Sequence, residues 1–258
     1  MKKFVKDLTV KAVEYPHELY VLLKLTDTEP LPECLPGQFV EVKVEGSPQT
    51  FLRRPISINF VDREKNELWL LIKKVGEGTH RLAELKAGDC LNLVFPLGNG
   101  FSPVQKVGEK VLLVGGGVGV APLLDYGKYL KKQGAQPVFL LGARSQSDLL
   151  EQELFKAIAP VYVTTEDGSA GEKGFVTNHS LLQKEQFVRI ATCGPTPMMK
   201  AVAHYARQAD VECEVSLENL MACGLGACLC CVENTTEGNL CVCKDGPVFN
   251  IRNLLWQV

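Results

Sequence analysis

At 258 residues, the chain is long enough for two domains and a small appendage, and its 46% hydrophobic and 22% charged residues are typical of a folded globular protein rather than a disordered or fibrous one. A formal net charge of −2 with no basic stripe argues against sequence-independent binding of nucleic acid. The basic N-terminus lacks the apolar run of a signal peptide and no later stretch approaches a membrane span, so we expect a cytoplasmic protein without a membrane partner.

The first hundred residues alternate short apolar runs with turn residues. Pro and Gly punctuate the pattern at 35–37 and again at 96–100. One helical piece is expected at 79–85, opened by Thr79 and closed by the Lys-Ala-Gly that follows. Such regular spacing predicts an antiparallel barrel or sandwich, with strands at 8–13, 20–25, 39–44, 56–61, 68–73 and 91–95.

Two features of this region favour a flavin dinucleotide. Arg54 offers a fork of donors suited to a phosphate, Pro55 fixes the chain direction, and Ser57 can hydrogen-bond a ring heteroatom. By itself an Arg-Pro at a strand edge is more often only a surface feature. The glycine loop at 73–79, however, opens the single helix of the region, and a helix N-terminus with free N–H groups suits a pyrophosphate.

From Lys110 onward, apolar runs alternate with helical segments, which predicts a doubly wound parallel sheet. A last strand, E-C-E-V-S-L, follows and leads into a cysteine-rich tail. We therefore expect an FAD-binding β-barrel at 1–103, an α/β domain at 104–212 and a cysteine-rich tail at 213–258.

Two glycine turns of the second region are candidates for dinucleotide binding. The first, Gly115-Gly116-Gly117-Val118-Gly119, follows a strand and opens a helix, although its match to G-x-G-x-x-G ends in Val120. The second, Cys193-Gly194-Pro195, lies at another helix N-terminus of the same sheet. Arg144 could bind a ribose or its phosphate, or could equally be a charged surface residue. The choice between NADH and NADPH as the substrate therefore remains open. The residues expected to contact the NAD dinucleotide are Gly115, Gly117, Gly119, Cys193 and Gly194.

Six of the ten cysteines fall between residues 223 and 243, which indicates a metal site in a reducing compartment. Cys223, Cys228 and Cys231 have the C-x4-C-x2-C spacing of a plant-type [2Fe-2S] centre. For the fourth ligand we prefer Cys243 to Cys241, because a tight turn follows it directly.

Glycines between these cysteines would let the loop fold around the cluster and direct N–H groups at the sulfurs. A structural zinc knot is less favoured, since it usually shows paired C-x2-C units. The isolated cysteines are interpreted as buried apolar thiols: Cys34, Cys90 and Cys213.

The motifs R-P-x-S, G-x-G-T, G-G-G-x-G-x-A-P and C-G-P occur in this order, and the chain thereby resembles the ferredoxin-NADP reductase family. The tail L-E-N-L-M-A-C-G-L-G-A-C-L-C-C-V, followed by C-K-D-G-P-V-F, is similar to the electron-transfer subunits of NAD-linked, type B dihydroorotate dehydrogenases. The small subunit of NADH-dependent ferredoxin-NADP reductases shares the pattern but has Asp at the first cluster ligand, where this chain has Cys223.

The resemblance implies a set of ligands for each cofactor. The cluster would be held by Cys223, Cys228, Cys231 and Cys243, while the additional Cys230 and Cys241 keep the choice open. FAD would be held by Arg54, Pro55, Ile56, Ser57, Leu71, Ile72, Lys73, Gly78 and Thr79.

The resemblance also implies a role in pyrimidine biosynthesis. Electrons would pass from the flavin of an FMN-containing catalytic subunit, through [2Fe-2S] and FAD, to NAD+, in a heterotetramer with two subunits of each kind. No catalytic acid or base is then required of this chain. The alternatives are a reductase subunit serving a hydrogenase, a sulfur reductase or a ferredoxin reductase, and a non-enzymatic zinc or redox-sensing module.

Overall fold

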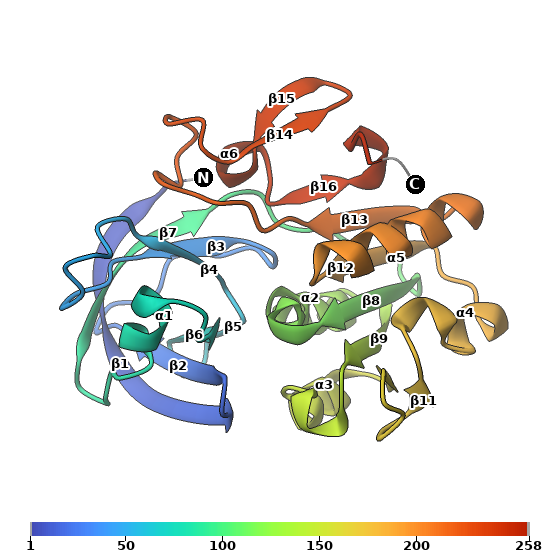
Figure 1. Cartoon of the computed structure of the whole chain (residues 1–258), viewed down its shortest axis with the longest axis horizontal. Helices are drawn as coiled ribbons and strands as arrows, with labels where there is room; N and C mark the ends of the chain where they lie inside the picture. The colour runs from blue at the N-terminus through green and yellow to red at the C-terminus, as the bar shows by residue number, and fades with distance from the viewer. Residues whose placement is uncertain (1, 257–258) are drawn as a thin grey trace.

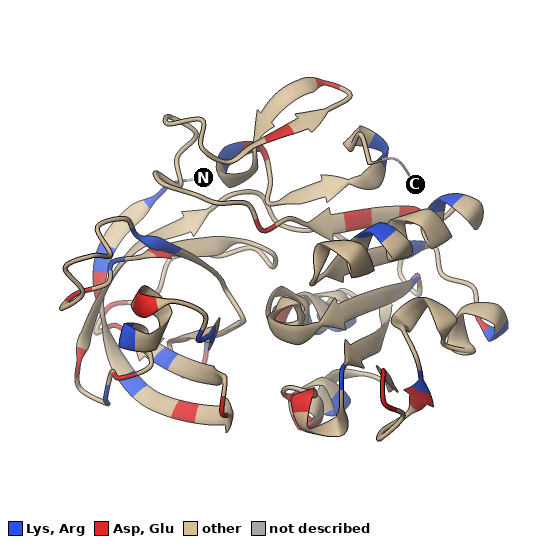
Figure 2. Cartoon of the chain, viewed as in Figure 1, with Lys and Arg blue, Asp and Glu red and all other residues tan. Residues whose placement is uncertain are grey.

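The computed structural model describes residues 2–256, which form two seven-stranded sheets side by side with the C-terminal segment lying across one end of both (Figure 1). Among these residues, no helix is both long and apolar enough to cross a membrane. Figure 2 shows Lys and Arg interspersed with Asp and Glu over both sheets.

The first sheet is antiparallel throughout, as the alternating apolar runs predicted. Its strand order is β4-β3-β7-β1-β2-β6-β5. The inward-facing residues of successive strands form one apolar core, and each fully buried Leu or Val contributes about 1.5–3 kcal/mol. The strands are β1 (Phe4–His17), β2 (Tyr20–Thr26), β3 (Phe39–Val42), β4 (Arg54–Ser57), β5 (Phe60–Asp62), β6 (Glu67–Lys73) and β7 (Cys90–Leu97).

The single strand predicted at 56–61 is wrong, because the structure breaks it into β4 and β5 at opposite edges of the sheet. The break lies at Ile58 and Asn59. The N–H of Ile58 donates to the carbonyl of Gln38 beside one edge, and the N–H of Asn59 donates to the carbonyl of Trp69 beside the other. These two residues therefore join the edges and curl the sheet into a barrel.

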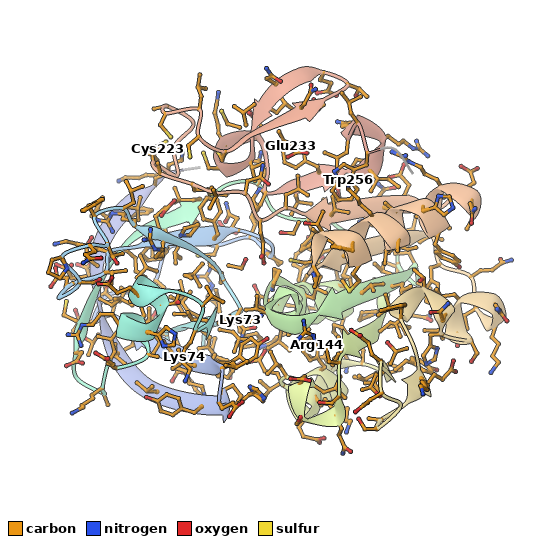
Figure 3. The ribbon with its side chains drawn as sticks, viewed as in Figure 1. Lys73, Lys74, Arg144, Cys223, Glu233 and Trp256 are labelled. Atoms are coloured by element: carbon orange, nitrogen blue, oxygen red, sulfur yellow. The ribbon has the colours of Figure 1, made fainter. Side chains whose placement is uncertain are left out.

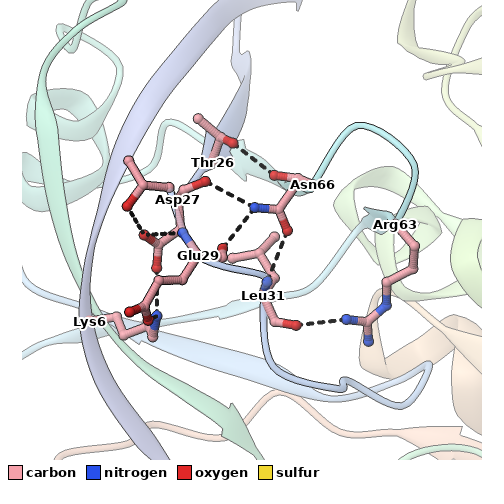
Figure 4. A network of polar contacts seen from close by, with 8 residues as sticks. Lys6, Thr26, Asp27, Glu29, Leu31, Arg63 and Asn66 are labelled. Atoms are coloured by element: carbon pink, nitrogen blue, oxygen red, sulfur yellow. Dashed lines mark hydrogen bonds and ion pairs between the residues drawn. The ribbon is translucent and has the colours of Figure 1, made fainter.

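The β5–β6 turn is tied to the loop after β2 by Asn66 (Figure 4). Asn66 has a φ of 53°, a conformation that Asn tolerates better than most residues. Its side-chain amide donates to the carbonyls of Asp27 and Glu29 and accepts the N–H of Leu31, while its own carbonyl accepts the Thr26 hydroxyl. The backbone groups of this loop are thus satisfied without strand pairing.

The second sheet has the order β11-β10-β9-β8-β12-β13-β16 and is parallel except at β16, which runs antiparallel to β13. This confirms the predicted doubly wound sheet. Its strands are β8 (Lys110–Gly116), β9 (Gln136–Ala143), β10 (Val161–Thr165), β11 (Glu172–Lys173), β12 (Arg189–Cys193), β13 (Glu212–Ser216) and β16 (Val248–Asn250).

Helices cover both faces of this sheet, because its central strands are apolar on both sides. The longer helices α2 (Ala121–Lys132) and α5 (Thr196–Gln208) pack on opposite faces, α2 against Leu113 and α5 against Leu112. Shorter helices complete the layers: α3 (Gln152–Ile158), α4 (Leu181–Lys184), η1 (Gly117–Val120), η2 (Gln146–Asp148) and η3 (Val176–Asn178).

The cysteine-rich tail is anchored to this sheet by strand pairing. It leaves at the end of β13, forms the hairpin β14 (Val232–Thr235) and β15 (Gly238–Cys241) and the turn of helix α6 (Val242–Asp245), and returns as β16 beside β13. The short helix η4 (Ile251–Asn253) follows β16. The expected boundary after 212 falls at the first residue of β13.

Candidate functional site

A cavity of about 690 Å³ lies where the barrel, the parallel sheet and the tail meet. Strands β4 and β6 supply one wall, the glycine turns after β8 and β12 supply another, and the segment after β13 closes the cavity together with Glu233 and Trp256. Eleven of the fourteen predicted cofactor contacts line it: Arg54, Pro55, Ile56, Ser57, Leu71, Ile72, Lys73, Thr79, Gly117, Gly119 and Gly194.

On the barrel wall, Arg54 is placed to receive an anion. Its Nη1 donates only to the carbonyls of Leu52 and Arg53, and none of the ion pairs within residues 2–256 includes it. A guanidinium that is not paired with a carboxylate is available to bind a phosphate. Gly78 lies outside the lining, but a Cβ there would come within 3.2 Å of Arg54 Nε, so the glycine makes room for this side chain.

The helix beside this wall, α1 (Glu77–Leu82), begins two residues before the predicted position and ends earlier. Thr79 is therefore not its first residue. The Thr79 hydroxyl oxygen instead accepts the N–H groups of Val75 and Gly76, at 2.9 and 3.0 Å. The side chain thus fixes the loop that enters the helix.

The opposite wall is made by two glycine turns that touch each other. A Cβ on Gly119 would lie 2.4 Å from the backbone N of Gly194, so only glycine permits this approach. Gly115 and Cys193 pair across β8 and β12 directly behind the turns and do not line the cavity. Burial raises the pKa of the Cys193 thiol far above its ordinary value, so this thiol is an unreactive part of the core behind the turns.

The third wall was missed by sequence reasoning, which interpreted the tail only as a cluster loop. Leu217, Glu218 and Asn219 follow β13 at the same sheet edge as the glycine turns, and the Asn219 amide donates to Glu233 at 3.0 Å. Glu218 lines the cavity, and desolvation by the surrounding protein raises the pKa of its carboxyl group despite the positive charge of Lys73.

The signal for this wall was the carboxyl end of the last parallel strand, β13, because ligands of open sheets gather at such strand ends. Figure 3 shows Glu233 and Trp256 on the tail side and Lys73 on the barrel side. Arg144 is not part of the lining; it lies near Asp148 and the Tyr20 hydroxyl.

The cysteine loop directs backbone N–H groups at three sulfurs. The N–H of Leu225 donates to Cys223 Sγ at 3.3 Å, that of Gly226 to Cys243 Sγ at 3.1 Å, and that of Cys243 to Cys231 Sγ at 3.3 Å. Such bonds are the outer-shell contacts that orient thiolates and tune an iron-sulfur centre. The predicted role of the loop glycines is confirmed for Gly226.

The four predicted ligands interact through their sulfurs. Burial opposes ionisation of Cys223, but the N–H groups of the loop and the Cys228 thiol outweigh it and lower its pKa to about 6. Burial and the adjacent Cys231 sulfur raise the pKa of Cys243 to about 12.

The chemistry of the donors suits an iron-sulfur cluster, because a plant-type [2Fe-2S] unit is held by four cysteine thiolates shared between two irons. Among the described residues, no group of three or more His, Cys, Asp or Glu side chains is placed to hold a single metal ion. Cys230 is exposed, whereas Cys241 is buried and its backbone N–H donates to Asp245.

The expectation for the isolated cysteines holds for two of the three. Cys34 and Cys213 are buried, but Cys90 is exposed at the first residue of β7. The apolar residues that follow Cys90 made it resemble a core position, and the structure instead places it at the rim of the barrel.

Two families match this sequence. Residues 218–255 match the iron-sulfur cluster binding domain of dihydroorotate dehydrogenase B, and residues 113–204 match the oxidoreductase NAD-binding domain. The dihydroorotate dehydrogenase B (NAD(+)) electron transfer subunit of Shouchella clausii is 43% identical over 222 residues, or 84% of this chain and 85% of the relative. The same subunit of Caldanaerobacter subterraneus subsp. tengcongensis is 42% identical, covering 86% of this chain and 87% of the relative.

Solved structures share the fold. An NADH-dependent reduced ferredoxin-NADP oxidoreductase, described for flavin-based electron bifurcation, has a TM-score of 0.88 at 31% identity over 96% of this chain and 90% of that one. The ferredoxin reductase in carbazole 1,9a-dioxygenase has a TM-score of 0.68 at 21% identity, over 82% and 67% of the two chains, which indicates a common fold alone.

Proposed function

This chain belongs to the family of electron transfer subunits of dihydroorotate dehydrogenase B, and we propose that its cysteine loop and its central cavity are the two sites through which electrons reach NAD+. It is an NAD-linked flavin and iron-sulfur oxidoreductase subunit that serves pyrimidine biosynthesis. When bound, FAD supplies the chemistry that links one-electron exchange with an iron-sulfur centre to two-electron exchange with nicotinamide.

The observation that carries the proposal is the continuity of the cavity with the cysteine loop. Residues 217–221 line the cavity, and Cys223 follows two residues later in the same segment. One short stretch of backbone therefore connects the flavin site to the cluster site. No side chain of this chain needs to act as an acid or base toward dihydroorotate.

We assign the barrel wall of the cavity to FAD and the glycine-turn wall to NAD+. Arg54 binds a phosphate, Pro55 to Ser57 and the edge of β6 hold the ring system, and Gly119 with Gly194 lets the nicotinamide nucleotide approach the backbone. Support comes from the unpaired charge of Arg54 and from the contact between the two turns. The preference between NADH and NADPH would be decided near Arg144.

We assign the cluster to Cys223, Cys228, Cys231 and Cys243. The preference for Cys243 over Cys241 is supported by the N–H of Gly226, which is directed at the Cys243 sulfur. No backbone donor within residues 2–256 is directed at Cys241 in the same way.

The partner is a catalytic subunit that oxidises dihydroorotate. We propose that this partner carries FMN, docks beside the cysteine loop and forms a heterotetramer with two subunits of each kind, in the cytoplasm where thiols stay reduced. Leu225 and Leu229 of the loop are exposed apolar residues that such a contact would cover.

The test is to purify the chain anaerobically and measure its flavin, iron, acid-labile sulfide and optical spectrum. NADH-driven dye reduction should occur with the chain alone, and dihydroorotate oxidation only after the catalytic partner is added. Dihydroorotate turnover by the chain alone would overturn the division of labour. Copurification with a hydrogenase, sulfur reductase or ferredoxin-dependent enzyme instead would reassign the partner.

A further inference from the structure

The barrel and the parallel sheet are joined by a polar contact between residues far apart in the sequence. Asn59 lies between β4 and β5, two residues after the end of the cavity wall, and is fully buried. Its Nδ2 donates to Glu151 Oε1 at 2.8 Å. Glu151 precedes helix α3, which covers the other sheet, so this bond connects the barrel to the helical layer of the parallel sheet.

Each partner retains one buried oxygen without a hydrogen bond. Within residues 2–256, neither Asn59 Oδ1 nor Glu151 Oε2 has a donor, and both atoms are shielded from solvent. Two buried acceptors without donors are costly, since an unsatisfied buried group loses its hydration without replacement. A proton on Glu151 removes the conflict, because a carboxylic acid donates as well as accepts.

We propose that Glu151 is a neutral carboxylic acid whose O–H donates to Asn59 Oδ1, so that the two side chains form a reciprocal pair of hydrogen bonds and latch the barrel onto the nucleotide-binding sheet. In this arrangement all four polar atoms of the pair are satisfied. Asn59 and Glu151 are positioning residues, because they set the distance between the cavity walls without touching a cofactor.

Burial, rather than the charges around it, favours the neutral form of Glu151. Lys24 on β2 faces it, but Lys24 is paired with Glu14 on β1 and lies 4.2 Å from the Trp69 ring. Burial, the largest effect, raises the pKa of Glu151 to about 7, and the Glu14 charge acts in the same direction.

The remaining charged groups near the contact have partners of their own. Lys128 of α2 lies over the Phe60 ring at 4.3 Å, and Asp148 of η2 faces His17 at 3.8 Å. Asp148 has the same sign of charge as an ionised Glu151 and cannot neutralise it, and Lys128 is held at the Phe60 ring.

Backbone conformation gives independent support. Glu151 has a φ of 52°, a left-handed conformation that costs about 1–2 kcal/mol for a residue with a side chain. Strain of this kind persists where surrounding contacts determine the geometry. Here the geometry brings the carboxyl group to Asn59.

The decisive variant is Glu151→Gln. A glutamine amide donates to Asn59 Oδ1 at every pH, so the latch is kept. Below about pH 5 the melting temperature of the flavin-loaded variant should equal that of the parent chain. Since the folded pKa of Glu151 exceeds the unfolded one, the parent loses stability as the pH rises from about 4.5 to 7. The variant should therefore gain an advantage on the order of 5 °C that levels off above pH 7.

Two further variants complete the comparison. Glu151→Ala removes the latch and should lower the melting temperature by about 5 °C at pH 6. Glu153→Gln, on the exposed face of the same helix, should leave it unchanged. If Glu151→Gln is as unstable as Glu151→Ala at pH 6, or if its difference from the parent does not depend on pH, the proposal is wrong.

An infrared difference spectrum supplies a direct readout should Glu151→Ala fail to fold. The carbonyl band of the protonated Glu151 carboxylic acid should disappear near neutral pH in the parent and be absent from Glu151→Gln. Because Asp125 also contributes such a band, the readout is the parent-minus-variant difference, and a difference spectrum with no acid carbonyl band would contradict the assignment.

The consequence for catalysis rests on the proposed function. In NADH-driven dye reduction, Glu151→Ala should raise the KM for NADH about tenfold with a smaller change in kcat, and Glu151→Gln should restore the parent value. If the parent chain itself does not react with NADH, the proposed function fails, while the melting data still decide whether the latch exists.

Discussion

Cys241 and Cys243 are two residues apart and have the same chemistry, yet their surroundings differ. The Cys243 sulfur receives the N–H of Gly226, and the Cys243 N–H is directed at the Cys231 sulfur. The Cys241 N–H is instead used by Asp245 at the end of α6. The N–H of Gly226 is directed at the Cys243 sulfur and not at the Cys241 sulfur. This contact distinguishes two candidate cluster ligands that the cysteine spacing could not tell apart.

Replacement of Cys243 by Ser should therefore abolish the cluster, whereas Cys241→Ser should retain it. The measurement is iron and acid-labile sulfide per chain after anaerobic reconstitution, together with the visible spectrum. Flavin content should be similar in both variants, which controls for folding. Retention of two irons in Cys243→Ser with loss in Cys241→Ser would reverse the assignment.

Gly224 is required for two reasons. It has a φ of +65°, and a Cβ there would lie 2.6 Å from Glu41 Cγ on β3, beneath the cysteine loop. Gly238 in the β14–β15 hairpin has a φ of +99° but open space around it.

Both alanine variants carry the backbone strain of about 1–2 kcal/mol, and only Gly224→Ala adds the clash with β3. We expect Gly224→Ala to lose iron and to destabilise the chain more than Gly238→Ala does. Iron content and thermal melting provide the comparison, and equal effects of the two substitutions would show that the contact with β3 is unimportant.

At the scale of elements, the two glycine turns after β8 and β12 act as one unit. Hydrophobic periodicity predicted both strands, and the order of the sheet makes them neighbours. Their carboxyl ends thus lie side by side, and the backbone of one turn contacts that of the other.

Gly119→Ala should push these turns apart, since its Cβ would lie 2.4 Å from Gly194. The KM for NADH should rise at least tenfold, while FAD binding on the barrel wall stays close to normal. Steady-state dye reduction and flavin content measure the two effects separately. An unchanged KM would show that NAD+ does not approach the chain at this point.

For the whole molecule, the contact between the barrel and the parallel sheet contains a second buried carboxyl group. Asp125 on α2 accepts the N–H of Val61 on β5, and burial raises its pKa to about 6, although Lys128 and Arg63 act in the opposite direction. Because the folded pKa lies above the unfolded value of 3.8, the stability due to the neutral form is lost as the pH rises from about 4 to 6.

Asp125→Asn removes this ionisation and keeps an oxygen for the Val61 N–H. Relative to the parent chain, we expect the variant to gain up to about 3 kcal/mol between pH 4 and pH 6 and to keep that gain above pH 6. Denaturant titrations at a series of pH values measure the difference. The exposed Glu84→Gln is the control; a pH-independent difference for Asp125→Asn would show that ionisation of this buried carboxyl group is not the cause.

The sequence by itself determined the classes of structure and most of the site. Alternating apolar runs specify antiparallel strands, apolar runs between helices specify a parallel sheet, and cysteine spacing specifies a plant-type cluster, because each of these patterns is local. Arg54 to Ser57 and the glycine turns were found in the same way, since each motif lies on a single turn or strand end.

Tertiary structure alone decided what depends on residues distant in sequence. It broke the run at 56–61 across two edges of a barrel, placed Glu218 and Trp256 in the wall of the cavity, and brought Asn59 against Glu151. It also moved Gly115 and Cys193 behind the cavity surface. The physical reason is that a sequence pattern contains only the order of neighbouring residues along the chain. Burial and the pairing of polar atoms depend instead on which distant segments the folded sheets bring together.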